Sequence, residues 1–217
     1  KAAKSGDPKV KAELEVLKAY KSCLETGRNA RSLDIPVEDQ AVIADLGLLT
    51  MKPMMYVANV DEKHLHADNN HVKALRDAVS KEGASMIVIC AALEAQIAEI
   101  TDKEEKKLFL EEYQLEESGL ARLIQAGYAL LNLITYFTAG EKEVRAWTIH
   151  KGWKAPQAAG VIHSDFEKGF IRAEVIKLAD YQKYKSEAGC REAGRLAVEG
   201  KEYVVEDGDI MHFRFNV

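Results

Sequence analysis

Two short segments of the sequence combine residue types that could recognise a nucleobase. In the first, Asn59 and Val60 follow an apolar run, and Glu62 comes three residues after the asparagine. In the second, residues 90–92 are small and also follow an apolar run. An asparagine side chain offers a donor and an acceptor, which matches the mixed edge of a purine. Small residues would let backbone amides approach the ring, so the two segments could form a slot for a base.

The same asparagine has a simpler explanation, which the residues alone leave open. An asparagine at the end of a strand is more often a turn former or a helix cap than a ligand contact. The spacing Asn-x-x-Glu is a weak motif by itself. Base recognition is therefore one of two interpretations of this pattern.

The elements that would position these residues alternate between strands and helices. Apolar runs at 53–59 and 84–90 predict buried strands, and 69–83 and 91–100 predict a helix after each. This alternation predicts a parallel, doubly wound sheet joined by a right-handed crossover, in which ligands bind at the carboxyl ends of strands. Two strands do not make such a sheet stable alone, so we expect the others to come from residues outside the chain.

Helices are also predicted before and after this region. Asp7 is a favourable N-cap with Pro8 in the first helical position, so a helix should run to about Gly27, and a second should span 36–47. One narrow apolar stripe on the first helix fits either a partner helix, as in a helical hairpin, or a globular core. The stripe consists of Val10, Leu14, Leu17 and Leu24. Two further helices are expected at 102–113 and 116–134.

The last part of the chain, from Thr135, has a different pattern. Short strands mixed with small helices in a segment of this length fit a compact α+β domain. We expect strands at 143–152 and 169–176, helices at 154–163 and 180–189, and a terminal hairpin over 201–217 that turns at Asp207 and Gly208.

Composition excludes several classes of protein. The 217 residues are 47% hydrophobic and 30% charged with a net charge of -5, so the chain is not a polycation that coats nucleic acid. Three cysteines without metal-ligand spacing argue for a reducing compartment rather than a disulfide framework. No apolar run is long enough to span a bilayer, and the start is no signal peptide. The chain begins at Lys1 without an initiator methionine, so we expect a fragment.

Two clusters of ionisable residues are assigned structural roles. The histidines of the first lie in a polar segment that predicts a solvated loop, so no metal site is expected. The second has no nucleophile at hand, so its residues are predicted to be turn formers and helix caps rather than acid–base catalysts. The clusters are His64, His66 and His71, and His163, Asp165 and Glu167.

The start of the last part is locally basic, which fits either an RNA-facing or ribosomal patch or a scattered solvated face. The six residues are Lys142, Arg145, Lys151, Lys154, Lys168 and Arg172. Trp147 is predicted to lie in the core and Trp153 at its rim, where it could stack on a base.

Five segments of the sequence carry a family resemblance: YVANVDE, CAALE, YFTAGEKEVRAWTI, HSDFEKGFIRAEVI and EDGDIMHFRFNV. In these segments the chain resembles the YchF family of Obg-related P-loop ATPases, and the similarity extends over essentially its whole length. The resemblance implies that 1–45 is the second half of a helical-hairpin arm, 46–133 the C-terminal half of a doubly wound P-loop G domain, and 134–217 a TGS domain. The TGS domain would have a ubiquitin-like β-grasp fold, so the expected class is α/β combined with α+β.

The resemblance also implies a preference for ATP over GTP. Related GTPases carry Asn-Lys-x-Asp at this strand end, whose aspartate accepts hydrogen bonds from guanine. In this sequence Val60 replaces the lysine and the longer Glu62 replaces the aspartate, and adenine lacks the donor pair that would satisfy an acid. Asn59 would contact the purine edge and Val60 would line the pocket, while Glu62 would contact the base or only cap or orient the loop. The opposite wall would consist of Cys90, Ala91 and Ala92.

The phosphate-binding motif Gly-x-x-x-x-Gly-Lys-Ser/Thr does not occur in the sequence. Without its amides and hydroxyl the chain lacks a cradle for phosphates and the ligands for Mg²⁺, so we expect no catalytic residue here and no hydrolysis by the chain alone. The resemblance implies ATP as the nucleotide, with GTP as the alternative, and a ribosome or tRNA/rRNA partner. A cytoplasmic monomer without membrane contact is expected. The rival functions are a non-enzymatic ribosome-binding adaptor and a stand-alone RNA-binding fragment.

Overall fold

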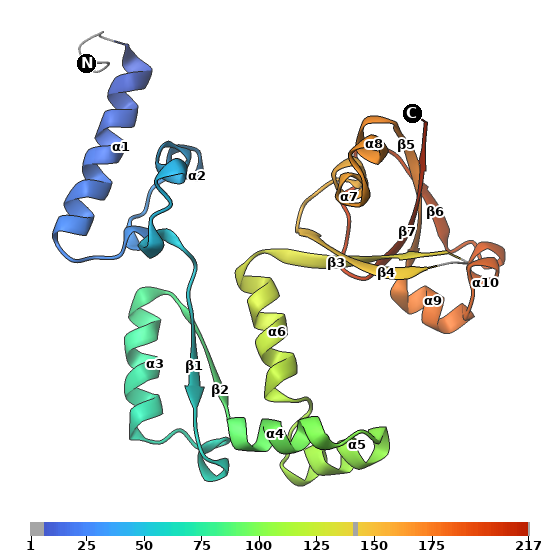
Figure 1. The fold of residues 1–217 in the computed structure, drawn as a ribbon, viewed down its shortest axis with the longest axis horizontal. Coiled ribbons are helices and arrows are strands. Elements are labelled where there is room, and N and C mark those ends of the chain that lie inside the picture. Colours follow the sequence, from blue (N-terminus) through green and yellow to red (C-terminus); the bar gives the residue numbers. More distant parts are fainter. Residues whose placement is uncertain (1–6, 141–142, 217) are drawn as a thin grey trace. The chain divides into compact units, whose positions relative to one another are not determined.

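The computed structural model describes residues 7–140 and 143–216 (Figure 1). The chain divides into two compact units, which meet in sequence between Leu123 and Ile124. Within the described ranges, no helix has both the length and the apolar character needed to cross a membrane.

The first unit begins with α1 (Pro8–Glu25), as the caps predict. The Asp7 side chain accepts a hydrogen bond from the Lys9 N–H at 2.9 Å, and Pro8 occupies the first turn. The helix packs through Tyr20 and Cys23 on short segments that follow it, rather than through its predicted stripe. Two members of that stripe are exposed, namely Leu17 (39%) and Leu24 (38%).

The second predicted helix, 36–47, is shorter and tighter than expected. It consists of one α-helical turn, α2 (Val37–Gln40), followed by the 3-10 helix η3 (Ala41–Leu46), and it ends at Gly47 with φ +56°. Ile43 of η3 is buried with Tyr20 and Ala30. Two more 3-10 turns, η2 (Ala30–Ser32) and η4 (Leu49–Met51), complete this region.

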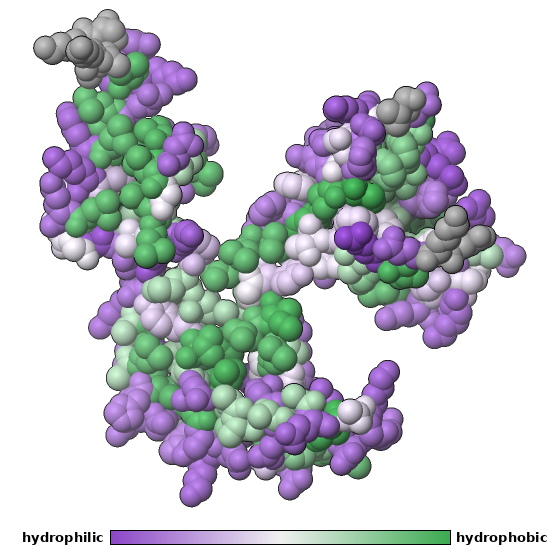
Figure 2. Space-filling view, viewed as in Figure 1, coloured by the Kyte–Doolittle hydropathy of each residue, from purple (hydrophilic) through white to green (hydrophobic). Residues whose placement is uncertain are grey.

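Both predicted strands of the first unit are present and run parallel. β1 (Met55–Asn59) pairs with β2 (Ser85–Ile89) in the register Met55↔Ser85 to Asn59↔Ile89. The helix α3 (Asn70–Glu82) lies between them in sequence and beside them in Figure 1. The prediction that the strands are buried is wrong for this chain, because each strand of a two-stranded sheet is an edge. Val57 is 42% exposed, and Figure 2 shows apolar surface over this sheet.

Three helices follow β2. They are α4 (Ala91–Glu99), α5 (Lys103–Glu112) and α6 (Gly119–Leu130). The predicted helix 116–134 is too long at its C-terminal end, because Asn132 has φ +55° and the next residue begins a strand. A left-handed residue stops a helix.

The second unit contains a five-stranded mixed sheet in the order β4-β3-β7-β5-β6. β3 and β7 are parallel, whereas the other neighbours are antiparallel. The strands are β3 (Leu133–Ala139), β4 (Val144–His150), β5 (Phe170–Lys177), β6 (Leu196–Glu199) and β7 (Asp209–Phe215). β4 and β5 were predicted, whereas β3 and β6 were not.

The predicted terminal hairpin is wrong. The turn at Asp207 and Gly208 is present, but β7 pairs with β5 and β3 rather than with the residues before the turn. Those residues contribute a single bridge, Lys154↔Val204. β7 therefore has a neighbouring strand on each side, whereas a local hairpin would pair it on one side only.

Four short helices accompany this sheet: α7 (Ala155–Ile162), α8 (Ser164–Lys168), α9 (Leu178–Tyr184) and α10 (Glu187–Glu192). The predicted helix 154–163 corresponds to α7, whereas 180–189 is divided between α9 and α10 at Lys185, where φ is +64°. α7 packs on one face of the sheet, where the Tyr136 hydroxyl donates to the Ala158 carbonyl at 2.9 Å. The buried core of the unit lies between them.

Candidate functional site

The carboxyl ends of β1 and β2 bring the two candidate segments together. The Val60 N–H donates to the Ile89 carbonyl at 2.8 Å, which extends the strand pairing by one residue. The Asn59 side chain crosses to the second segment, where its Oδ1 accepts the Ala91 N–H at 3.0 Å. This hydrogen bond therefore joins two segments that are 32 residues apart in the sequence.

This contact limits what Asn59 can offer to a ligand. Its side-chain oxygen is engaged inside the protein, whereas the Nδ2 amide has a donor to give and the residue is exposed. The expectation that Asn59 presents both a donor and an acceptor is thus narrowed to the donor.

The second segment exposes only two of its three residues. Cys90 is 2% exposed, and it packs with Leu93 and Ile97 in the core of α4. Ala91 and Ala92, which begin α4, are exposed. Of the three residues expected to form the opposite wall, only the two alanines are exposed, whereas Cys90 is buried in the core.

The loop after β1 is organised by Asp61 rather than by Glu62. Residues Glu62–His64 form a 3-10 turn, η5, whose cap is Asp61: its Oδ1 accepts the His64 N–H at 3.1 Å and lies 2.5 Å from Nδ1 of that ring. Asp61, rather than Glu62, is therefore the cap of this turn. Glu62 is exposed. Its negative charge is the largest cause that raises the pKa of Tyr113, and the burial of the Tyr113 hydroxyl is the second.

Two further residues near this site, His66 and Glu94, make hydrogen bonds that the sequence did not indicate. Nε2 of His66 lies 2.7 Å from the Tyr113 carbonyl, so the ring donates to an oxygen 47 residues away. Glu94 of α4 accepts hydrogen bonds from the N–H groups of Gly119 and Leu120, at 2.7 and 3.0 Å. An acid in the first turn of a predicted helix is the only local signal for Glu94, and it does not name the partner.

The histidine-rich loop holds no group arranged for a metal. His64 and His66 contact different partners, and among the described residues no three His, Cys, Asp or Glu side chains converge on a possible ion. The predicted cap role of the other cluster is confirmed for His163, whose Nδ1 accepts the Asp165 N–H at 3.2 Å at the start of α8.

The basic residues of the second unit do not gather in one place. Arg145 lies over the Trp147 ring, 4.0 Å from its centre, and Lys154 pairs with Glu202. Arg172 is on β5, which two strands separate from β4 and its Arg145. The remaining described members, Lys151 and Lys168, are exposed, and Lys142 lies outside the described residues.

The two tryptophans occupy similar environments. Trp147 is half-buried rather than fully in the core, and its indole N–H donates to the Thr138 hydroxyl at 2.9 Å. Trp153 is also half-buried against the core of the unit, as expected for a rim position.

Two solved structures have a fold similar to that of this chain. A GTP-binding protein from Pyrococcus horikoshii OT3 aligns with a TM-score of 0.54 at 18% identity, over 95% of this chain and 56% of that one. The YchF GTPase of Schizosaccharomyces pombe aligns with a TM-score of 0.80 at 40% identity, over 94% of this chain and 55% of that one. The first likeness concerns the fold alone, whereas the second extends to the sequence.

The chain belongs to the YchF family. A family model named YchF-GTPase_C, described as a protein of unknown function (DUF933), matches residues 133–216. The chain is 54% identical over 217 residues to the Ribosome-binding ATPase YchF of Escherichia coli O157:H7, and 51% identical over 219 residues to that of Bacillus subtilis. All of this chain is covered in both cases, but it spans only 59% and 60% of those relatives.

Proposed function

We propose that this chain is part of a nucleotide-binding, ribosome-associated ATPase of the YchF type, which prefers ATP to GTP. The observation that carries the proposal is the contact between Asn59 and Ala91, which joins two strand-end loops at the edge where α/β sheets bind ligands. The purine would lie between Asn59 and Val60 on one side and the exposed Ala91 and Ala92 on the other. Relatives of this chain are named ATPases, which supports ATP as the nucleotide.

Asn59 supplies affinity for a purine but no selectivity. Among the described residues its Nδ2 amide has no hydrogen-bond acceptor, so this amide suits N7, an acceptor that adenine and guanine share. Selectivity then falls to the two other residues of the loop. A shorter acid in place of Glu62 would reach the donor pair of guanine, and the same acid against adenine would be desolvated without a partner. Glu62 is exposed, so its carboxylate keeps its water instead.

We propose three functional regions. Residues 1–45 form part of a helical arm, 46–133 part of a G domain, and 134–217 a TGS domain with the β-grasp fold. The strand order supports the last assignment, because β3 and β7, the first and last strands of the unit, are central, parallel neighbours. A relative's name supports a ribosomal partner, and with it a cytoplasmic place of action.

Hydrolysis requires groups that this sequence does not contain. No phosphate-binding loop occurs in it, and the described residues offer no cluster that fits Mg²⁺. We therefore assign no catalytic step to these residues, and we expect the chain alone to be inactive. A non-enzymatic adaptor remains the rival, and a turnover assay on a form with a phosphate-binding loop, with and without ribosomes and potassium, distinguishes the two.

The base assignment is tested by changing the selectivity of the loop. In a form of the protein that includes a phosphate-binding loop, Val60→Lys with Glu62→Asp should shift the ratio of ATP to GTP affinity toward GTP by about tenfold, the size of a hydrogen bond to a charged group. Isothermal titration calorimetry measures both affinities. Lys63→Ala, an exposed change in the same turn, is the control and should leave the ratio unchanged. An unaltered ratio in the double variant would refute the assignment.

A further inference from the structure

The carboxylate of Glu94, in α4, accepts hydrogen bonds from the first residues of α6. Its Oε1 accepts the Gly119 N–H at 2.7 Å and its Oε2 accepts the Leu120 N–H at 3.0 Å. These are the first two residues of α6, whose N–H groups have no partner within the helix. Ser118 satisfies the next one, because its hydroxyl accepts the Ala121 N–H at 3.1 Å. The carboxylate also interacts favourably with the positive end of the helix dipole.

The contact with Glu94 leaves no room for a side chain at Gly119, the first residue of α6. Gly119 is buried, and a Cβ added there would lie 2.8 Å from Oε1 of Glu94 and 3.0 Å from Cγ2 of Ile89. α6 is tied to β2 at a second point, where Nη2 of Arg122 donates to the Val88 carbonyl at 3.2 Å. The start of α6 is therefore fixed against both α4 and the end of β2.

The helix α4, which carries Glu94, also forms one wall of the proposed base site. Its first N–H, from Ala91, donates to Oδ1 of Asn59 across the strand ends. Glu94 lies three residues later, about one helical turn, so the first turn of α4 is held on one side by β1 and on the other by α6. The loop between β2 and α4 has no other side-chain cap, since Cys90 provides none.

We propose that Glu94 is a positioning residue for the base site. By holding α6, it fixes the first turn of α4, and this keeps Ala91 and Ala92 in place opposite Asn59. The inference rests on the proposed function for its consequence, because the wall matters only if a base binds there. Glu94 itself touches no ligand. The competing explanation is that Glu94 caps α6 and has no effect on the first turn of α4.

Amide hydrogen exchange separates the two explanations. In the ¹⁵N-labelled chain, Glu94→Gln loses one of the two accepted hydrogen bonds and turns an amide donor toward the other N–H. We expect exchange at Gly119, Leu120 and also Ala91 to accelerate about tenfold, the equivalent of one hydrogen bond. If Gly119 and Leu120 accelerate while Ala91 does not, Glu94 is only a cap and the proposal is overturned.

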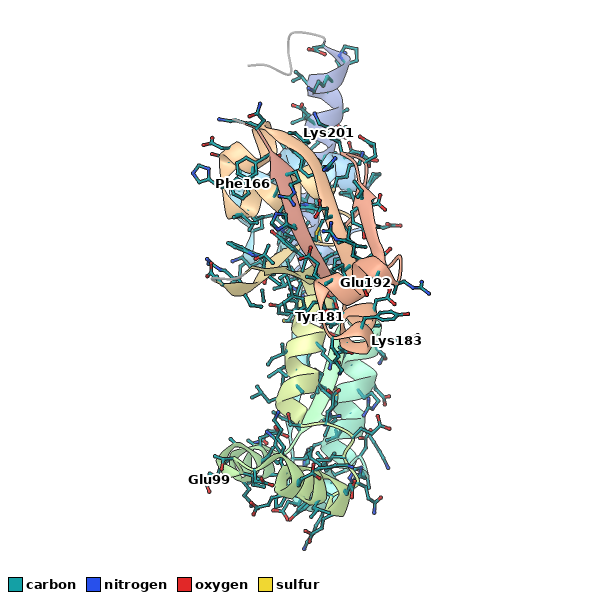
Figure 3. The ribbon with its side chains drawn as sticks, turned by 90° about the vertical axis from the view of Figure 1, so that its right-hand side faces the viewer. Glu99, Phe166, Tyr181, Lys183, Glu192 and Lys201 are labelled. Carbon is teal, nitrogen blue, oxygen red and sulfur yellow. The ribbon has the colours of Figure 1, made fainter. Side chains whose placement is uncertain are left out.

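A matched control and a second variant guard against a general loss of stability. Glu99→Gln changes the same residue type at the last, exposed position of α4, at the margin of the molecule in Figure 3, and should alter none of the three amides. Gly119→Ala keeps the charge of Glu94 but displaces its carboxylate, so it should reproduce the pattern of Glu94→Gln. Unchanged exchange at Ala91 in both variants, with the fold intact by circular dichroism, contradicts the proposal.

Adenosine titration then links the positioning role to the base site. Chemical shift changes at Ala91 should require roughly threefold more adenosine in Glu94→Gln than in the unaltered chain, a fraction of one hydrogen bond. If the unaltered chain shows no response, the proposed function fails while the exchange result still decides the role of Glu94. Equal adenosine responses in the two proteins would show that α4 is positioned without Glu94.

Discussion

The two sheets found among the described residues are built from similar apolar segments but differ in how they are covered. In the first unit, β1 and β2 have one neighbour each, and Ala58 is the only buried residue of β1. In the second, β3, β5 and β7 each lie between two strands, and α7 packs on one face. An apolar run thus indicates a strand, whereas its burial depends on how many neighbours the rest of the structure supplies.

The two units also differ in how deeply their polar and charged contacts are buried. Asp209 of β7 is fully buried, and its carboxylate accepts from Lys177 at 2.8 Å, from the Tyr203 hydroxyl at 2.6 Å and from the Glu206 N–H at 2.9 Å. Burial lowers the pKa of Lys177, but hydrogen bonds with Asp209, Glu206 and Tyr203 outweigh it and raise the pKa overall. At the candidate site, by contrast, the hydrogen bond between Asn59 and Ala91 is made by an exposed side chain.

The largest effect should follow from breaking this buried network. Asp209→Ala removes the buried acceptor of three hydrogen bonds and should lower the free energy of unfolding of the second unit by about 4 kcal/mol. Fluorescence during denaturant unfolding reports on this unit alone, because the only two tryptophans of the sequence, Trp147 and Trp153, belong to it. Asp180→Ala is the control.

Oδ1 of Asp180 lies 3.9 Å from Nε of Arg195, and because both side chains are partly exposed, the loss of this pair should cost less than about 1 kcal/mol. Equal losses in the two variants would mean that the buried network adds nothing beyond a surface pair, and the contrast between the units would lose one of its supports.

A core truncation in the first unit should leave the tryptophan signal unchanged. Leu93 is 0% exposed between Cys90 and Ile97, so Leu93→Ala should destabilise α4 and its neighbours by about 3 kcal/mol. Hydrogen exchange in α4 measures the local loss. The fluorescence transition of the second unit should move by less than about 0.5 kcal/mol, as expected for independent sites.

Leu108→Ala, at a 67% exposed position of α5, serves as the control and should change neither quantity. A shift of the fluorescence transition as large as the local loss would show that the two units unfold together.

A smaller effect is expected from alkaline pH on the second unit. Burial and the hydrogen bond to Asp209 raise the pKa of Tyr203 from 10 to about 12. Because the folded pKa is the higher one, the stability from the neutral hydroxyl is complete below pH 10 and is lost as the pH rises toward 12. Allowing for solvent screening of this half-buried group, the loss should be about 1 kcal/mol.

Denaturant unfolding at pH 8 and pH 11, followed by tryptophan fluorescence, measures this loss. Tyr203→Phe cannot ionise and should show a weaker dependence on pH, although Lys177 and the buried Tyr136, whose pKa burial raises, contribute in the same direction. An identical dependence in the variant would mean that Tyr203 does not couple to folding.

The sequence predicted elements that have local start and stop signals. Asp7 and Asn69 cap α1 and α3 with their side chains, and Gly83 ends α3 with φ +66°. β3 was missed because the apolar pattern of α6 continues into it, and only the left-handed Asn132 separates the two. β6 is four residues long, too short for a clear pattern, and the partners of β7 depend on long-range pairing.

The candidate site was predictable to a similar extent. Asn59 and the segment 90–92 stand out because they follow apolar runs, and parallel pairing brings such ends together. The contacts of Glu94 and His66 were not predictable, because their partners lie 25 and 47 residues away and are backbone groups, which carry no sequence signal. Cys90 was misplaced because side-chain direction at a helix start depends on the core beneath it.

Adenosine titration of the ¹⁵N-labelled chain tests the central claim most directly, with Asn59→Asp as the partner experiment. That variant keeps an oxygen to accept the Ala91 N–H but loses the Nδ2 donor. The account predicts shift changes at the Asn59 side-chain amide, Val60, Ala91 and Ala92 in the unaltered chain, and a loss of the response in the variant. Shift changes that avoid both strand-end loops, or that persist unchanged in Asn59→Asp, would contradict it.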